Sequence, residues 1–263
     1  MTPESLAVFL ACSFAAEVIG TIAGFGAATV LTPIASWFFP IKTAVALVAC
    51  FHLFGNASRL SFFGRHIDWR IAVRFGLIGV ACSFLGAWLS LWLSPSLMRL
   101  LLGGFLVLYA TLGRLPSGSR SSLAEGVVAV SATTVRVPAR TSTLVTGGAL
   151  SGLIAGVIGT GGAVRSMCLL AFGLPKEAYL GTSAVIALVV DATRVPVYLS
   201  QGLLPRDLWL ILAALTVVAF AGAWLGQRLV RIIPAARFKQ FVLVLLLLMG
   251  AKLLWDGWRG MAP

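Results

Sequence analysis

The chain has 263 residues, of which 59% are hydrophobic and only 11% are charged. Because a water-soluble domain usually carries about 25% charged residues, this composition excludes a soluble globular protein and predicts an all-α membrane protein embedded in the lipid bilayer. The net charge of +12 is attributed to arginines in cytoplasmic loops. Basic patches interleaved with aromatic residues are absent, so we expect no nucleic-acid partner.

The hydrophobic residues form five apolar segments in each half of the chain. They cover residues 5–23, 26–38, 43–63, 70–93 and 96–113, and then residues 142–158, 162–173, 178–200, 207–227 and 236–255. The second segment of each half is too short to cross a membrane, since thirteen helical residues reach about 20 Å and the hydrocarbon core is roughly 30 Å thick. Each short segment starts at a glycine cluster and ends near Pro40 or Pro175. We therefore expect two half-helices, each part of a broken or re-entrant pair.

The two halves repeat the same motifs. Gly24-Phe25-Gly26 and Asn56-Ala57-Ser58-Arg59 return, 135 residues later, as Gly159-Thr160-Gly161-Gly162 and Asp191-Ala192-Thr193-Arg194. We predict one integral membrane domain composed of a first repeat (residues 1–113), a polar cytoplasmic linker (residues 114–141) and a second repeat (residues 142–263). Within the linker, residues 127–137 have a pattern compatible with a short strand.

The distribution of basic residues predicts that the two repeats are inverted relative to each other. If the linker is cytoplasmic, twelve of the 20 lysines and arginines lie on the cytoplasmic side and five on the opposite side. This bias follows the rule that cytoplasmic loops are enriched in Lys and Arg. It places both termini outside the cytoplasm. The remaining three basic residues, Arg59, Arg165 and Arg194, fall inside apolar segments.

The glycine clusters are the first candidate substrate site. Glycines inside a membrane helix either allow close helix packing, as the spacing of Gly152 and Gly156 suggests, or break the helix. Several glycines in close succession are too unfavourable for a continuous helix, so we favour a break at both clusters. The half-helices would then direct unpaired N–H groups toward the midplane, where they favour an anion. The residues assigned to this site are Gly24, Gly26, Gly159, Thr160, Gly161 and Gly162.

Arg165 lies in the first turn after the second glycine cluster. A charged residue at membrane depth indicates function by default, and we expect Arg165 to be an anion ligand. The alternatives are a structural ion pair and a charge that faces the cytoplasm. Two hydroxyl residues, Thr182 and Ser183, are candidates for hydrogen bonds to an oxyanion.

The pairs Asn56/Arg59 and Asp191/Arg194 each place both members on one face of a helix. Asp191 and Arg194 can form a salt bridge, which either holds the halves together or is broken by substrate or a proton during transport. Arg59 has no local carboxylate, so we expect it to be freer to bind an anion.

Three residues are candidates for proton coupling: His52, Asp191 and Glu17. His52 lies one turn before Asn56 and is either a proton carrier, because histidine titrates near neutral pH, or a hydrogen-bond partner for a neighbouring helix. Glu17 is expected to pair with Arg165 or Arg59, or to carry a proton. The four cysteines have no metal-ligand spacing, and we expect no metal or other cofactor.

The chain resembles the TauE/SafE family of sulfite exporters. The resemblance rests on the duplicated glycine-rich first helix, on Gly181-Thr182-Ser183 opening the third helix of the second half, and on the motif Gly86-Ala87-Trp88-Leu89 with its copy Gly222-Ala223-Trp224-Leu225. It implies a multi-pass protein of the bacterial inner membrane that moves sulfite or organosulfonates such as sulfoacetate.

The sequence therefore favours a secondary transporter of small sulfur-containing anions that works by alternating access. Alternatives are a transporter or channel for another small anion or a carboxylate, and an intramembrane enzyme. An enzyme is disfavoured because His52 has no second histidine or carboxylate at ligand spacing nearby in the sequence. A homodimer is compatible with the sequence.

Overall fold

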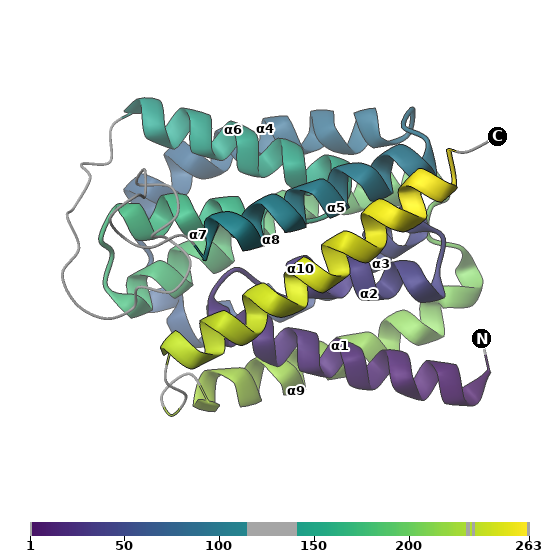
Figure 1. Ribbon diagram of the computed structural model, residues 1–263. Helices are drawn as coiled ribbons and strands as arrows, with labels where there is room; N and C mark the ends of the chain where they lie inside the picture. Colours follow the sequence, from purple (N-terminus) through teal and green to yellow (C-terminus); the bar gives the residue numbers. More distant parts are fainter. Residues whose placement is uncertain (1, 115–140, 230–231, 233–234, 262–263) are drawn as a thin grey trace.

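The computed structural model describes residues 2–114, 141–229, 232 and 235–261, and the regular structure in these ranges is helical. The elements, shown in Figure 1, are α1 (Pro3–Ala23), α2 (Ala28–Phe38), α3 (Ile41–Phe63), η1 (Gly64–His66), α4 (Trp69–Ser90), α5 (Pro95–Leu112), α6 (Thr141–Ile158), α7 (Gly162–Ala171), α8 (Lys176–Ser200), η4 (Arg206–Leu208), α9 (Trp209–Leu229) and α10 (Ala235–Arg259). The ten helical segments expected from the sequence are thereby confirmed, with ends that differ by a few residues. The strand considered for residues 127–137 lies outside the described residues.

The helices of the described chain fall into two length classes. Eight are long and apolar enough to cross a membrane, whereas α2 and α7 have only 11 and 10 residues. At a rise of 1.5 Å per residue the short helices reach about 15 Å, which is half of a hydrocarbon core of roughly 30 Å. The expected half-helices are therefore present, and the protein is a multi-pass membrane protein.

Local sequence signals explain where several helices begin. Pro40 and Pro175 immediately precede α3 and α8, with φ angles of −50° and −53°. Proline fixes such a φ and has no N–H to continue the preceding helix, so each proline separates a half-helix from the long helix that follows it. Asp68 and Ser94 cap α4 and α5, because their side chains accept hydrogen bonds from backbone N–H groups one turn later.

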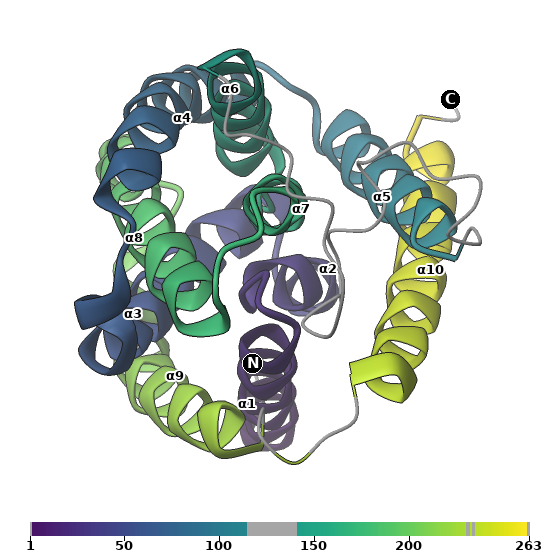
Figure 2. The same ribbon diagram turned by 90° about the vertical axis from the view of Figure 1, so that its left-hand side faces the viewer.

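Helices from the first part of the chain pack against helices from the second part. The pairs in contact are α1 with α9, α3 with α8, α4 with α6, α5 with α10, and α2 with α7. Figure 2 shows α2 and α7 between an arc formed by α6, α4, α8, α3, α9 and α1 and, on the other side, the α5–α10 pair. The two half-helices are thus enclosed by long helices.

Glycines bring several of these helix pairs close together, as small residues do in membrane proteins. A Cβ on Gly152 would touch the carbonyl oxygen of Gly79, so α6 and α4 meet backbone to backbone. In the α5–α10 pair, Cβ atoms on Gly103 and Gly250 would each lie within 2.9 Å of the other residue's carbonyl oxygen. For Gly152 the packing alternative is therefore confirmed.

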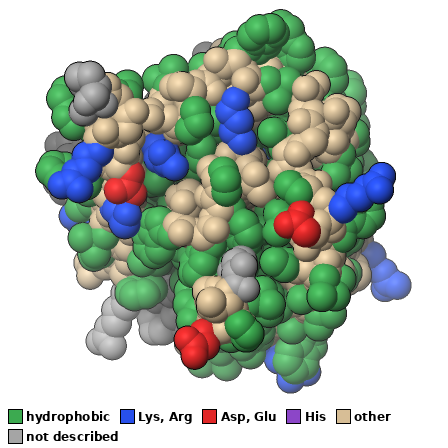
Figure 3. All heavy atoms as spheres, turned by 90° about the vertical axis from the view of Figure 1, so that its right-hand side faces the viewer, with side chains coloured by type: hydrophobic (Ala, Val, Ile, Leu, Met, Phe, Trp, Pro, Cys, Tyr) green, Lys and Arg blue, Asp and Glu red, His purple; other side chains and the backbone are tan. Residues whose placement is uncertain are grey.

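The chain termini lie at one end of the molecule, and the end of α5 and the start of α6 lie at the other (Figure 1). Consequently α6 runs in the direction opposite to α1. Viewed from the end that holds the termini, basic and acidic side chains are scattered among hydrophobic side chains, other side chains and exposed backbone (Figure 3).

Candidate functional site

The two glycine clusters interrupt the helices and lie against each other inside the molecule. The residues after α1 and α6, Gly24 and Gly159, have φ angles of +78° and +81°, which favour glycine. The hydroxyl of Thr160, after the second break, donates to the hydroxyl of Thr29 in the first turn of α2 at 2.9 Å. Tyr179 of α8 donates to the carbonyl oxygen of Gly24 at 2.8 Å. The breaks are therefore joined directly, and the half-helices α2 and α7 start close to each other.

The N-termini of both half-helices lack a side-chain cap. No side-chain hydrogen bond is made by Ala27 or Gly161, which hold the N-cap positions of α2 and α7, and both residues are buried. The first N–H groups of a helix have no intrahelical acceptor and carry the positive end of the helix dipole. Two buried, uncapped N-termini together make an environment suited to an anion.

Two glycines are required for this close contact. A Cβ on Gly162 would touch the carbonyl oxygen of Phe25, so the second break could not approach the first with a larger residue there. Gly26 has a φ of +86°, and a Cβ on it would touch Nε2 of His52. A substitution at either position would separate the two breaks or displace His52.

Arg165 is buried beside the second break, with a side chain that is 3% exposed. Its Nε donates to the hydroxyl of Ser183 at 3.0 Å, and its Nη2 lies 3.5 Å from the position that a Cβ on Gly162 would take. The guanidinium therefore folds back toward the N-terminus of α7. Among the described residues it has no carboxylate partner within 4.0 Å.

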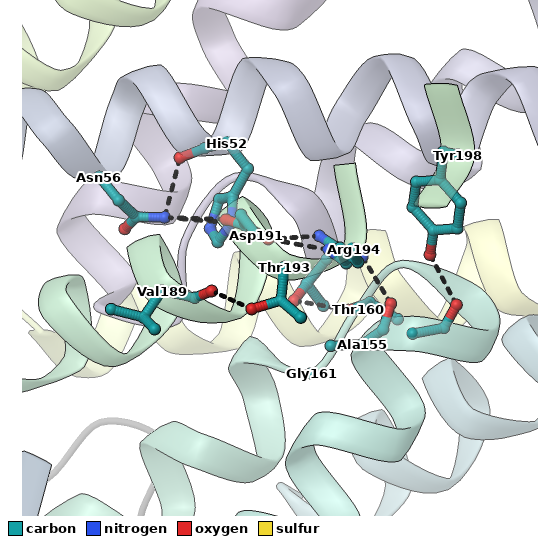
Figure 4. Close-up of polar contacts among 12 residues, drawn as sticks. His52, Asn56, Ala155, Thr160, Gly161, Val189, Asp191, Thr193, Arg194 and Tyr198 are labelled. Carbon is teal, nitrogen blue, oxygen red and sulfur yellow. Dashed lines mark hydrogen bonds and ion pairs between the residues drawn. The ribbon is translucent and has the colours of Figure 1, made fainter. Parts of the chain in front are cut away.

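A second polar cluster connects α3 to α8 (Figure 4). Nδ1 of His52 lies 2.8 Å from Oδ2 of Asp191, and Nη2 of Arg194 lies 2.7 Å from Oδ1 of the same carboxylate. Arg194 also donates to the carbonyl oxygen of Ala155 at 2.5 Å. The expected Asp191–Arg194 salt bridge is present, and Asp191 is shared between an arginine and a histidine.

Arg59 is not free, contrary to the expectation from the sequence. It forms an ion pair with Glu17 of α1, and it donates to the side-chain oxygens of Asn56 at 3.0 Å and Thr21 at 3.1 Å. The missing local carboxylate is supplied by another helix, which spacing along α3 could not reveal. Of the two partners considered for Glu17, the structure selects Arg59 and not Arg165.

The two predicted hydroxyl residues have different surroundings. Ser183 lies at Arg165, as described above. The hydroxyl of Thr182 instead accepts a hydrogen bond from the backbone N–H of Asp68 at 2.9 Å. Thr182 therefore joins α8 to the start of α4, a contact that the sequence did not suggest, while its O–H remains able to donate.

Comparison with known protein families identifies the family of this chain. A family model described as the sulfite exporter TauE/SafE matches residues 9–253. The chain belongs to the TauE/SafE family. The family implies a membrane transporter of sulfite or related sulfur anions, which fits a buried cationic site between two half-helices. Neither the curated proteins nor the solved structures contain a match.

Several residues around the two helix breaks of this TauE/SafE protein were missed by sequence reasoning. Thr29 is the only hydroxyl residue in the first turn of α2. Its position directly after the first glycine cluster is a sequence signal that could have marked it as a candidate site residue. Ser166 donates to the carbonyl oxygen of Gly24 at 3.1 Å, and Ser151 donates to that of Gly161 at 2.9 Å. Together with Tyr179, these residues stabilise the carbonyl groups of the breaks. Their partners are distant in sequence or follow an irregular turn, so no periodic pattern marks them.

A separate cavity of about 430 Å³ lies between α5, α6 and α7. Its lining is mostly apolar, and it includes Val164, Met167 and Cys168 of α7. Arg165 is not among the lining residues, and none of them belongs to the predicted site. The candidate site and this apolar cavity are therefore lined by different residues.

Proposed function

We propose that this TauE/SafE protein moves a small sulfur oxyanion, such as sulfite or an organosulfonate, across the bacterial inner membrane by alternating access. The anion would bind between the N-termini of α2 and α7, with Arg165 as its main charged ligand and Ser183, Thr160 and Thr29 near it.

Arg165 is the observation that carries the proposal. A buried arginine in a membrane protein is unfavourable unless it is paired or hydrated, and the other two buried arginines each have a carboxylate within salt-bridge distance. Arg165 has no such partner among the described residues, and it lies where two helix dipoles already favour negative charge. An oxyanion would supply the missing countercharge and accept hydrogen bonds from both the guanidinium and the helix ends.

Alternating access is supported by the arrangement of the two halves. Every helix of the first half packs against a helix of the second half, and α6 runs opposite to α1 (Figure 1). We propose that residues 1–113 and 142–263 are inverted repeats, with a pseudo-two-fold axis passing between α2 and α7. Inverted repeats with discontinuous helices at the midplane are a recurring design of secondary transporters.

The charge of the substrate decides whether the membrane potential favours its export or its import. An inside-negative membrane potential drives an anion outward by about 2.3 kcal/mol per charge per 100 mV. Export of an anion therefore needs no coupled ion, whereas import requires coupling, for example to protons.

Transport by the purified protein in proteoliposomes tests the proposal. We expect at least one of sulfite, sulfoacetate, taurine and sulfate to move when voltage and pH are set. Arg165→Gln should reduce transport by about tenfold or more, because hydrogen bonds to a charged group contribute about 1.5–3 kcal/mol. The matched control is Arg206→Gln, which changes an exposed arginine and should leave transport unchanged.

Two outcomes would contradict the proposal. If none of the four compounds moves, the assignment of a small sulfur anion is wrong. If Arg165→Gln transports at the same rate and with the same affinity as the unmodified protein, the anion binds elsewhere.

A further inference from the structure

His52 has one satisfied and one unsatisfied ring nitrogen. Its Nδ1 lies 2.8 Å from Oδ2 of Asp191, while its Nε2 is buried and has no hydrogen-bond partner among the described residues. The side chain is only 4% exposed. The unpartnered nitrogen lies against Gly26, in the first break, where a Cβ would touch it. His52 therefore directs an unused nitrogen at the break next to the uncapped N-terminus of α2.

The proton on His52 decides what this nitrogen can bind. We assign Nδ1 as the donor to Asp191, because an ionised carboxylate can only accept, and the nearby Nδ2 of Asn56 donates to the backbone carbonyl oxygen of His52. In the neutral ring Nε2 then carries only a lone pair. A lone pair repels an oxyanion. Protonation converts Nε2 into a charged N–H donor that needs an acceptor, since a buried donor without one is strongly unfavourable. An anion in the break would be that acceptor.

The charges around His52 indicate for which substrate charge a protonated His52 balances the site. Asp191 and Arg194 on α8 form one ion pair, and Glu17 on α1 and Arg59 on α3 form another. Arg165 on α7 has its Nη2 beside Gly162, which packs against Phe25 of the first break, and has no carboxylate partner among the described residues. With His52 neutral, the site has one excess positive charge and balances a monoanion. With His52 protonated, it has two and balances a dianion.

We propose that His52 takes up one proton when a dianion binds and none when a monoanion binds. Nε2 gains the proton and donates it in a hydrogen bond to a substrate oxygen, while Nδ1 stays bonded to Asp191. The proton returns to water on the side where the dianion is released. This inference rests on the proposed anion site, and it makes the proton a co-substrate of that site for doubly charged anions only.

The test uses two sulfonates whose charge does not change near neutral pH: sulfoacetate as the dianion and methanesulfonate as the monoanion. Binding to the detergent-purified protein is measured by titration calorimetry at one pH in two buffers with different ionisation enthalpies, which gives the number of protons taken up. We expect about one proton per sulfoacetate and none per methanesulfonate. Because this comparison uses the unmodified protein, it does not depend on the stability of any variant.

Two histidine variants provide matched controls, since the chain has only two histidines. His52→Gln should abolish proton uptake with sulfoacetate and weaken its binding by about tenfold or more, because a charge-assisted hydrogen bond is lost. Methanesulfonate binding should change by less than about twofold on the same reasoning. His66→Gln alters an exposed ring in η1 and should behave like the unmodified protein.

The outcomes separate this inference from the proposed function. Sulfoacetate binding without proton uptake, or proton uptake that persists in His52→Gln, would overturn the role of His52 and leave the anion site intact. Equal proton uptake with both sulfonates would also overturn it. If neither sulfonate binds, the inference fails together with the sulfonate assignment of the proposed function.

Discussion

The three arginines buried in the helices differ in how their charge is balanced. Arg59 pairs with Glu17 from another helix, and Arg194 pairs with Asp191 one turn away on the same helix. The side chain of Arg165 has only Ser183 as a hydrogen-bond partner among the described residues. Removing one member of a buried ion pair leaves the other charge uncompensated. Removing a charge that has no ion-pair partner leaves no uncompensated charge in the protein. The arginines should therefore contribute to stability in opposite ways.

This difference can be measured by changing Arg194 and Arg165 separately to methionine. Arg194→Met should destabilise the protein by about 3–5 kcal/mol, because Asp191 loses its cationic partner. Arg165→Met should be as stable as the unmodified protein or more stable, while losing anion binding. Melting temperatures in one detergent, without added anion, check both expectations. A similar loss of stability in both variants would show that Arg165 has a structural counterion after all.

At the scale of helices, close packing and helix breaks both depend on glycine, but for different reasons. Gly152 and Gly79 let α6 and α4 approach until their backbones touch. Gly24 and Gly159 have positive φ angles and follow directly on the ends of α1 and α6. The first role needs a missing side chain, and the second needs a left-handed backbone. The same residue type therefore holds some helices together and interrupts others.

The packing role predicts the result of adding a single methyl group. Gly152→Ala should destabilise the protein by about 1–3 kcal/mol, since the new Cβ would collide with the backbone of Gly79 and the helices cannot separate without losing contacts. The matched control is Gly104→Ala in α5, where a Cβ would have nothing within 4 Å. This change should stabilise the helix by about 0.5–1 kcal/mol. Thermal unfolding of both variants is the measurement, and equal effects would argue against tight packing of α4 with α6.

At the scale of the whole molecule, the helix pairing and the charge bias lead to one topology. Both termini lie at one end, and the end of α5 and the start of α6 lie at the other (Figure 1). Twelve of the 20 basic residues are assigned to the cytoplasmic side, so we expect the termini outside the cytoplasm.

Cysteine labelling in whole cells tests this topology. In a background with the four native cysteines changed to alanine, Met261→Cys should react with a membrane-impermeant maleimide in intact cells. Arg114→Cys should react only after the cells are permeabilised. Both residues are exposed, so access is limited only by the membrane. Labelling of both positions from the same side would be incompatible with the proposed inverted repeats.

Much of the fold could be predicted from the sequence because its signals are local. The length of each apolar run set the number of helices, and glycine and proline marked the half-helices, since both act through the backbone at their own position. The apolar runs made Arg165, Asp191 and Arg194 stand out, because a charge within an apolar run is conspicuous without any knowledge of its neighbours.

The partners of these residues were decided by the tertiary structure. The sequence predicted that Arg59 is freer to bind an anion, but Glu17 reaches it from another helix. Thr182 accepts a hydrogen bond from the backbone of Asp68, which no spacing along α8 could indicate. The contact between Thr160 and Thr29, and the unpartnered nitrogen of His52, likewise arise where segments distant in sequence meet. Hydropathy and spacing describe one helix at a time. Which charges are neutralised, and which remain available to a substrate, depends on how the helices pack.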